Sequence, residues 1–109
     1  MRCIMKVAIP VERGNEMIHD GSLGKSIESI LSEMKPESVY FCDWDGKRTG
    51  IVVFDLKDPS QIPAIAEPWF LAFNAQIEIH PCMNLEDLKK SAPGMQQAVK
   101  KHHEMKKAA

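Results

Sequence analysis

The chain has 109 residues and a mass of 12.3 kDa, a length that predicts a single domain. Its composition, with 44% hydrophobic and 27% charged residues, excludes a low-complexity or disordered chain, and a net charge of −1 does not favour nucleic acid or an anionic membrane as partner. No apolar run is long enough for a membrane span, and residues 1–10 lack the features of a signal peptide, so we expect a cytoplasmic protein.

The first elements are predicted from a change of hydrophobic period. Residues 2–9 alternate in the manner of a strand. Residues 15–35 carry apolar side chains at helical spacing, which predicts a helix. Gly21 and Gly24 weaken its first half, and Ser22 is a good cap for a fresh start, so we expect a bent helix or one that begins late.

A hairpin is predicted over residues 39–56. Asp45 and Gly46 suit the central positions of a type I′ turn, and a two-residue loop pairs Tyr40 with Ile51. Both faces of this hairpin are largely apolar. One face carries Val39, Phe41, Val52, Phe54 and Leu56, and the other carries Tyr40, Cys42, Trp44, Thr49, Ile51 and Val53.

The second half repeats the strand and helix patterns. Asp58 begins a turn that leads into a helix, which we expect Pro68 to divide into two short pieces. Residues 74–83 alternate again and predict a strand. Asn84 caps a last helix, with a break expected at residues 93–94 and a basic tail over about 100–109 that frays.

The predicted order of elements is typical of a ferredoxin-like βαββαβ sandwich, an α+β fold with a four-stranded antiparallel sheet, followed here by a C-terminal helix. Its helices cover one face of the sheet and leave an apolar face with Tyr40, Trp44 and Ile51 in water. Soluble monomers rarely expose such a patch. Two sheets packed face to face would cover it, so we expect a homodimer.

Several runs resemble a family of uncharacterised small bacterial proteins in the dimeric α/β-barrel superfamily. The resemblance extends from about residue 4 to residue 100, and residues 20–25, 35–37, 40–41, 45–50, 60–68 and 83–88 carry it. It implies that residues 1–109 are one domain and that the two sheets of a homodimer form a barrel. The superfamily includes cofactor-free quinol monooxygenases, haem-degrading enzymes and small-ligand sensors, and the fold does not choose among them.

A small-molecule site is predicted in the space between the two sheets. Lys6, Tyr40, Trp44, Glu78 and His80 are expected on the face toward the partner. A mostly apolar cleft with a few polar groups is the usual form of such a site. The structural alternative is a cross-strand ion pair between Lys6 and Glu78, with Tyr40 packed in the dimer interface.

Two further residues have both a functional and a structural interpretation. His80 is a proton shuttle or ligand candidate with Glu78 as its orienting partner, or a structural hydrogen-bonding residue at a strand end. Glu67 stands at the expected helix break, where it either contacts a ligand or pairs with a cation. Asp43 and Arg48 form an expected cross-strand pair near the hairpin turn.

The remaining patterns are better explained by a structural role than by a binding or catalytic role. Residues 20–25 faintly resemble a phosphate loop but lack its spacing, and His19 beside them is expected in solvent. Cys3, Cys42 and Cys82 are an odd set without a CxxC pair, so we expect reduced and mostly buried thiols and no zinc site.

The sequence therefore predicts a homodimer of unknown function, with a site for a small apolar or aromatic molecule near the inter-sheet space. No cofactor, metal, nucleic acid or membrane partner is expected. The first alternative is a cofactor-free monooxygenase acting on a small aromatic or quinol-like substrate. The second is a metal or haem protein that uses His80 or His19.

Overall fold

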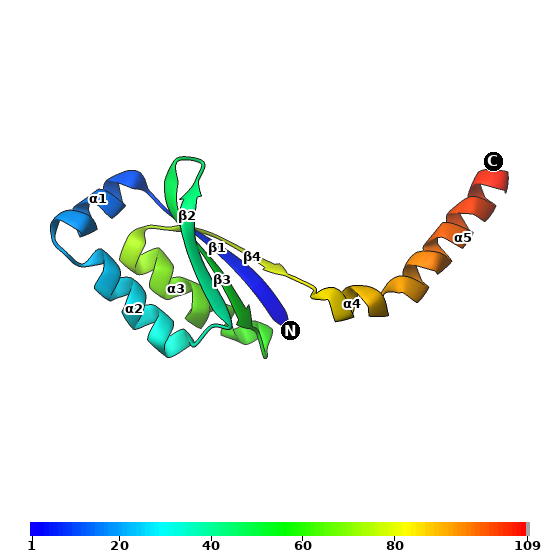
Figure 1. The fold of residues 1–109 in the computed structure, drawn as a ribbon, viewed down its shortest axis with the longest axis horizontal. Helices are drawn as coiled ribbons and strands as arrows, with labels where there is room; N and C mark the ends of the chain where they lie inside the picture. Colours follow the sequence, from blue (N-terminus) through cyan, green and yellow to red (C-terminus); the bar gives the residue numbers. More distant parts are fainter. Residues whose placement is uncertain (109) are drawn as a thin grey trace.

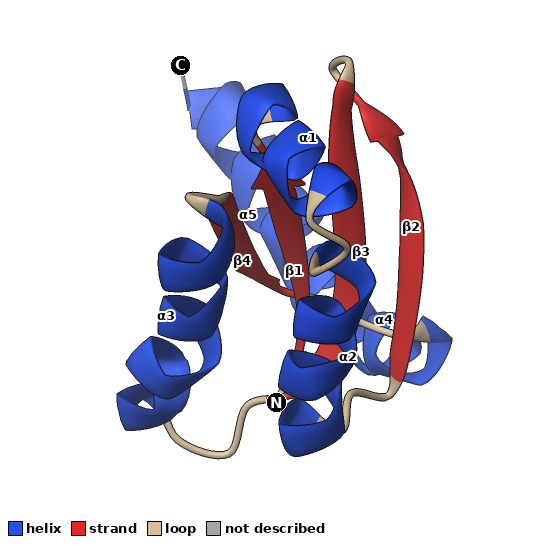
Figure 2. Ribbon diagram, turned by 90° about the vertical axis from the view of Figure 1, so that its left-hand side faces the viewer, coloured by secondary structure: helices blue, strands red, loops and turns tan. Residues whose placement is uncertain are grey.

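A computed structural model describes residues 1–108 and has the predicted ferredoxin-like α+β architecture, with a four-stranded antiparallel sheet in the order β2-β3-β1-β4 (Figures 1 and 2). The strands are β1 (Arg2–Ile9), β2 (Ser38–Trp44), β3 (Lys47–Asp55) and β4 (Gln76–Pro81). The helices are α1 (Val11–His19), α2 (Leu23–Met34), α3 (Ile62–Phe73), α4 (Leu85–Lys90) and α5 (Ala92–Ala108), with a short 3-10 helix at Pro59–Gln61. Figure 2 shows α1, α2 and α3 together on one side of the sheet.

The core lies between this helical layer and the central strands. Met5 of β1 pairs with Val52 of β3 and with Ile79 of β4, so these three side chains share the helix-facing side. The helices contribute Trp69 and Phe73, which are almost fully buried. The predicted hairpin register is confirmed, because Tyr40 lies opposite Ile51 and the turn residues Asp45 and Gly46 both have positive φ.

The first helical segment consists of two helices. α1 begins at Val11, earlier than predicted, and α2 begins at Leu23 after a turn in which Gly21 has a φ of +78°. The expected fresh start after Ser22 is thus confirmed, although its side chain makes no cap hydrogen bond. Gly21 permits this turn because the backbone of a residue with a side chain would be strained at such a φ.

The prediction that Pro68 divides the next helix was wrong. α3 is continuous from Ile62 to Phe73 with Pro68 inside it. A proline in a helix interior loses one backbone hydrogen bond and crowds the preceding turn, at a cost of about 3 kcal/mol. Burial of Ala66, Trp69 and Phe73 against the sheet offsets this cost and keeps the two halves aligned.

An arm, defined here as residues 84–108, extends from the end of β4 (Figure 1). Asn84 and Asp87 form the expected capping box at the start of α4. The break falls at Ser91 and not at residues 93–94, because Pro93 is accommodated in the first turn of α5. α5 continues to Ala108; the predicted fraying stays a prediction, and residue 109 lies outside the described part. None of the helices in residues 1–108 has the length and apolar composition of a membrane span.

Two exposed ion pairs link the start of β1 to neighbouring segments. Arg2 donates two hydrogen bonds to the carboxylate of Glu37, at 2.9 and 2.7 Å, and the N-terminal ammonium group donates one to Asp55 at 2.9 Å. The hydrogen bonds from Arg2 lower the pKa of Glu37, and those from the ammonium group lower the pKa of Asp55.

These contacts predict that the Tm falls as the pH is lowered below about 4. A carboxyl group whose pKa is lower in the folded state stabilises that state above its unfolded pKa, and the contribution is lost as the pH falls through the folded pKa. The decline should begin near the ordinary carboxyl pKa of about 4. Thermal unfolding followed by circular dichroism should give a flatter decline for Glu37→Gln and an unchanged one for Glu28→Gln. A Glu37→Gln slope equal to the unmodified one would contradict this assignment.

Candidate functional site

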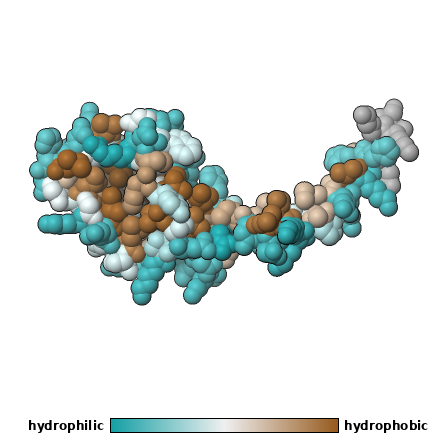
Figure 3. Space-filling view, in the orientation of Figure 1, coloured by the Kyte–Doolittle hydropathy of each residue, from teal (hydrophilic) through white to brown (hydrophobic). Residues whose placement is uncertain are grey.

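A cavity of about 620 Å³ lies on the helix side of the sheet, between α1, α2 and the β2–β3 hairpin. Its lining is mostly apolar and includes Val7, Ile9, Leu23, Ile27, Phe41 and Trp69. Figure 3 shows apolar side chains gathered on this face between α2 and β2. A second hollow of similar volume lies where β4 meets the arm, but charged side chains such as Arg2, Glu37 and Asp87 line it. The apolar cavity is therefore the better site for an apolar molecule.

The cavity exists because the helices leave the edge strand β2 uncovered. Phe41 points to the helix side, opposite Gly50, yet its side chain is 56% exposed. Gly50 contributes no side chain, and a Cβ placed there would lie 3.5 Å from Cε1 of Phe41, which is ordinary contact. A Cβ therefore fits at position 50, and Gly50 is one of the residues that line the cavity.

Arg48 links the hairpin to α1 at the rim of the cavity. Its Nη2 donates to Oδ1 of Asn15 at 3.0 Å, and its Nη1 donates to the carbonyl of Val11 at 3.5 Å. α1 and the Arg48 side chain approach so closely that a Cβ on Gly14 would lie 2.6 Å from Nη1 of Arg48. The register pairs Asp43 with Arg48 as predicted, but within residues 1–108 no ion pair joins them, because Arg48 turns toward α1.

Trp69 contributes both to the lining of this cavity and to the core. Its side chain is 1% exposed. Its Nε1–H is buried and has no hydrogen-bond partner in the described part of the chain. A buried donor without a partner costs about 1–3 kcal/mol. Because almost none of the Nε1 surface is accessible, a molecule in the cavity would contact other atoms of the Trp69 side chain.

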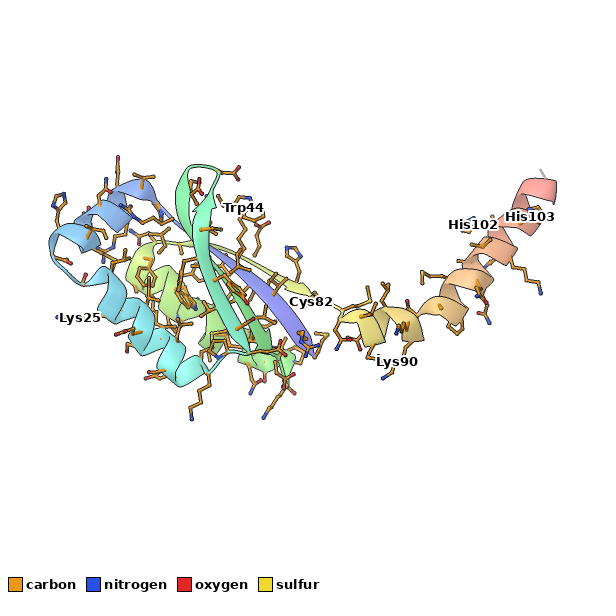
Figure 4. The ribbon with its side chains drawn as sticks, viewed as in Figure 1. Lys25, Trp44, Cys82, Lys90, His102 and His103 are labelled. Carbon is orange, nitrogen blue, oxygen red and sulfur yellow. The ribbon has the colours of Figure 1, made fainter. Side chains whose placement is uncertain are left out.

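Three of the residues predicted for the inter-sheet site lie together on the open face of the sheet. Nζ of Lys6 is 3.6 Å from Oε2 of Glu78 and 4.6 Å from the ring centroid of Trp44. The expected cross-strand ion pair is therefore present, with a cation–π contact added to it. The three side chains line a hollow of about 270 Å³, and Figure 4 shows Trp44 on the side of the hairpin away from α1 and α2.

The other predicted site residues lie farther from this cluster. Tyr40 is opposite Ile51 and His80 is opposite Ile4, so both share the open face, and both are exposed. Glu67 is an exposed residue of α3 and belongs to the helical layer on the other side of the sheet. The structure thus brings together Lys6, Trp44 and Glu78 and separates Glu67 from them.

In the loop before α2, polar groups form hydrogen bonds with one another. The carboxylate of Asp20 accepts a hydrogen bond from the backbone N–H of Ser22 at 2.8 Å, and hydrogen bonds from Ser22 lower the pKa of Asp20. This occupies a backbone donor that a phosphate loop would offer to a ligand, and His19 beside it is exposed as expected.

The expectation of mostly buried cysteines was wrong, since only Cys3 is buried while Cys42 is exposed and Cys82 is half-buried.

The helix-side cavity was missed in the sequence. Its one signal is Gly50 inside a strand pattern, because a strand glycine often marks a place where another group comes close. Phe41 did not indicate a cavity, since its apolar character fits a core position equally well. Exposure of the β2 edge depends on where α1 and α2 pack, which is a tertiary property.

Comparison with solved structures finds chains of low sequence identity. A formyltetrahydrofolate deformylase from Pseudomonas putida KT2440 matches with 16% identity and a TM-score of 0.48, over 75% of this chain and 29% of the deformylase chain. The de novo designed protein Ferredog-Diesel matches with 11% identity and a TM-score of 0.42, over 73% of this chain and 83% of the designed chain. The chain thus spans less than a third of the deformylase.

Comparison with curated proteins returned no match. A family model described as "Domain of unknown function (DUF3303)" matches residues 31–96, which include β2, β3, α3 and β4 and more than half of the chain. The chain therefore belongs to this family of domains of unknown function.

Proposed function

We propose that the protein is a homodimer that binds a small apolar or aromatic molecule in the cavity between α1, α2 and the hairpin. The observation that carries this proposal is the mostly apolar cavity of about 620 Å³, whose lining includes Phe41 and the side chain of Trp69. Its volume falls within the range of about 300–1,000 Å³ that is usual for small-molecule sites.

The lining defines the class of ligand. An aromatic or aliphatic body suits the apolar side chains of Val7, Ile27 and Phe41. Asp43, Lys47 and Arg48 lie among the lining residues, so a polar end of the ligand can remain near charged groups and water. A neutral aromatic ketone, quinone or phenol has this combination.

The dimer follows from the open face of the sheet. Tyr40 and Trp44 are 67% and 49% exposed there, next to the partly exposed Ile4, Ile51 and Val53. Packing this face against a second copy at about 10 Å would bury it. The cluster of Lys6, Trp44 and Glu78 would then lie between the two sheets with Tyr40 and His80 nearby, and its hollow of about 270 Å³ makes it the second candidate site.

Partly filling the cavity should weaken binding. We predict that Gly50→Leu lowers the affinity for 1-naphthol or 1,4-naphthoquinone at least about tenfold, a change of about 1.4 kcal/mol in binding free energy. The new side chain occupies the space beside Phe41 without a clash at its Cβ. Isothermal titration calorimetry on both proteins measures the difference.

Gly24→Leu is the matched control, because it adds the same side chain at an exposed glycine of α2 that has open space around it. Its affinity should equal that of the unmodified protein. Equal affinities in all three proteins, or no heat with either compound, would contradict the proposal. Oxygen uptake with quinols added to the same samples tests the monooxygenase alternative separately.

A further inference from the structure

We propose that the arm of each chain packs against the body of a second copy and clasps the dimer. The body is defined here as residues 1–83. This inference rests on the proposed dimer and adds to it the partner surface that completes the assembly. Its evidence is the direction of the arm, its exposed apolar stripe and its charge.

The arm points toward the side where a second copy would lie. Figures 1 and 2 together place α4 and α5 beyond the open face of the sheet, on the side opposite α1, α2 and α3. The molecule is 65 Å long but only 28 and 23 Å across. Its radius of gyration is 19.1 Å, whereas a compact chain of about 100 residues has one of about 13 Å.

The length of the arm is sufficient to pass a partner sheet. A helix rises 1.5 Å per residue, so the 17 residues of α5 span about 25 Å. A sheet packed on the open face would lie about 10 Å away. α5 therefore extends past the partner's sheet and alongside its helical layer.

The arm carries an apolar stripe that its own body leaves uncovered. Leu85 and Leu88 are one turn apart in α4 and are 65% and 45% exposed, and Met95 and Val99 are one turn apart in α5 and are 49% and 70% exposed. α4 and α5 have their main contacts with each other. In proteins most of the stability of a helix comes from packing of an apolar face against another element.

The charges of the arm and the body are opposite. Residues 1–83 contain twelve acidic and eight basic side chains, whereas residues 84–109 contain three acidic and six basic ones. Figure 4 shows Lys90, His102 and His103 on the arm, far from the body of their own chain. The body of a second copy therefore has a charge complementary to that of the arm, and it would lie where the arm extends.

The test compares Val99→Glu with Gln97→Glu in the full chain. Both variants add one negative charge to an exposed position of α5, but Gln97 lies on the other side of the helix from the stripe. Sedimentation equilibrium should show that Val99→Glu raises the dimer dissociation constant at least about tenfold and that Gln97→Glu changes it less than about twofold. Because Val99 is 70% exposed, circular dichroism should show a folded protein in both cases.

Hydrogen exchange and isotope-filtered spectra separate the remaining outcomes. Amides of α5 should exchange slowly in the dimer and fast after dilution, and in mixed dimers the Val99 methyl groups of a labelled chain should give NOEs to the unlabelled chain. A monomer at all concentrations would overturn the proposed dimer and the clasp together. Equal dissociation constants for the dimers of the two variants would overturn the clasp alone. Amide exchange in α5 that is as fast in the dimer as in the monomer would do the same. NOEs only within one chain would show instead that the arm folds back on its own body.

Discussion

The Val53→Lys variant should be monomeric at concentrations where the unmodified protein is a dimer. Val53 is in β3 on the open face, between Ile4 and Ser38 of the neighbouring strands. A lysine at this position would place an unpaired charge from each chain between the two sheets. Burying unpaired charge of like sign costs several kcal/mol, so the dimer dissociation constant should rise at least about a hundredfold.

Light scattering coupled to size exclusion measures this change. Leu71→Lys is the control, because Leu71 is 79% exposed on α3 in the helical layer, and this variant should remain a dimer. Tyr40→Lys provides a second disruption at a side chain that is already 67% exposed, so its folding is not in question. A dimer that persists in both open-face variants would show that another surface forms the interface.

Phe73→Ala should strongly destabilise the protein, because it removes a fully buried side chain of the helical layer. The Phe73 ring is fully buried and lies 5.7 Å from the ring of Trp69, between α3 and the sheet. Removing a buried aromatic ring leaves a cavity and costs about 3–5 kcal/mol. For a chain of this size the Tm should fall on the order of 15 °C.

Leu71→Ala, two residues earlier in the same helix, is the matched control. This side chain is mostly in water, so its truncation should change the free energy of unfolding by less than about 0.5 kcal/mol. Urea unfolding of the three proteins gives both values. If Phe73→Ala and Leu71→Ala were equally stable, the ring would not be part of the core.

The sheet was predictable from the sequence because its signals are local. Alternation over residues 2–9 and the Asp45-Gly46 turn predicted β1 and the hairpin register, which the structure confirms. Asn84 likewise predicted the start of α4 through its capping box. Pro68 was misjudged because its local cost is outweighed by burial of Trp69 and Phe73, and that burial depends on the folded structure.

The candidate site was predictable only in part. Strand alternation placed Lys6, Trp44 and Glu78 on one face, and the register brings them into contact. The helix-side cavity exists because no helix in residues 1–108 covers Phe41 and because Gly50 has no side chain. Neither the packing of α1 and α2 nor the unpaired state of the Trp69 nitrogen has a sequence pattern, so both required the structure.

The most direct measurement is the ¹⁵N–¹H spectrum of the indole groups during a titration with 1-naphthol. The chain has two tryptophans, and Trp44→Phe assigns the two signals. Binding in the helix-side cavity predicts that the Trp69 signal shifts and saturates as an aromatic ligand occupies the space that this side chain lines, while the Trp44 signal stays in place. A Trp69 signal that does not move, or one that moves equally in Gly50→Leu, would contradict binding in this cavity.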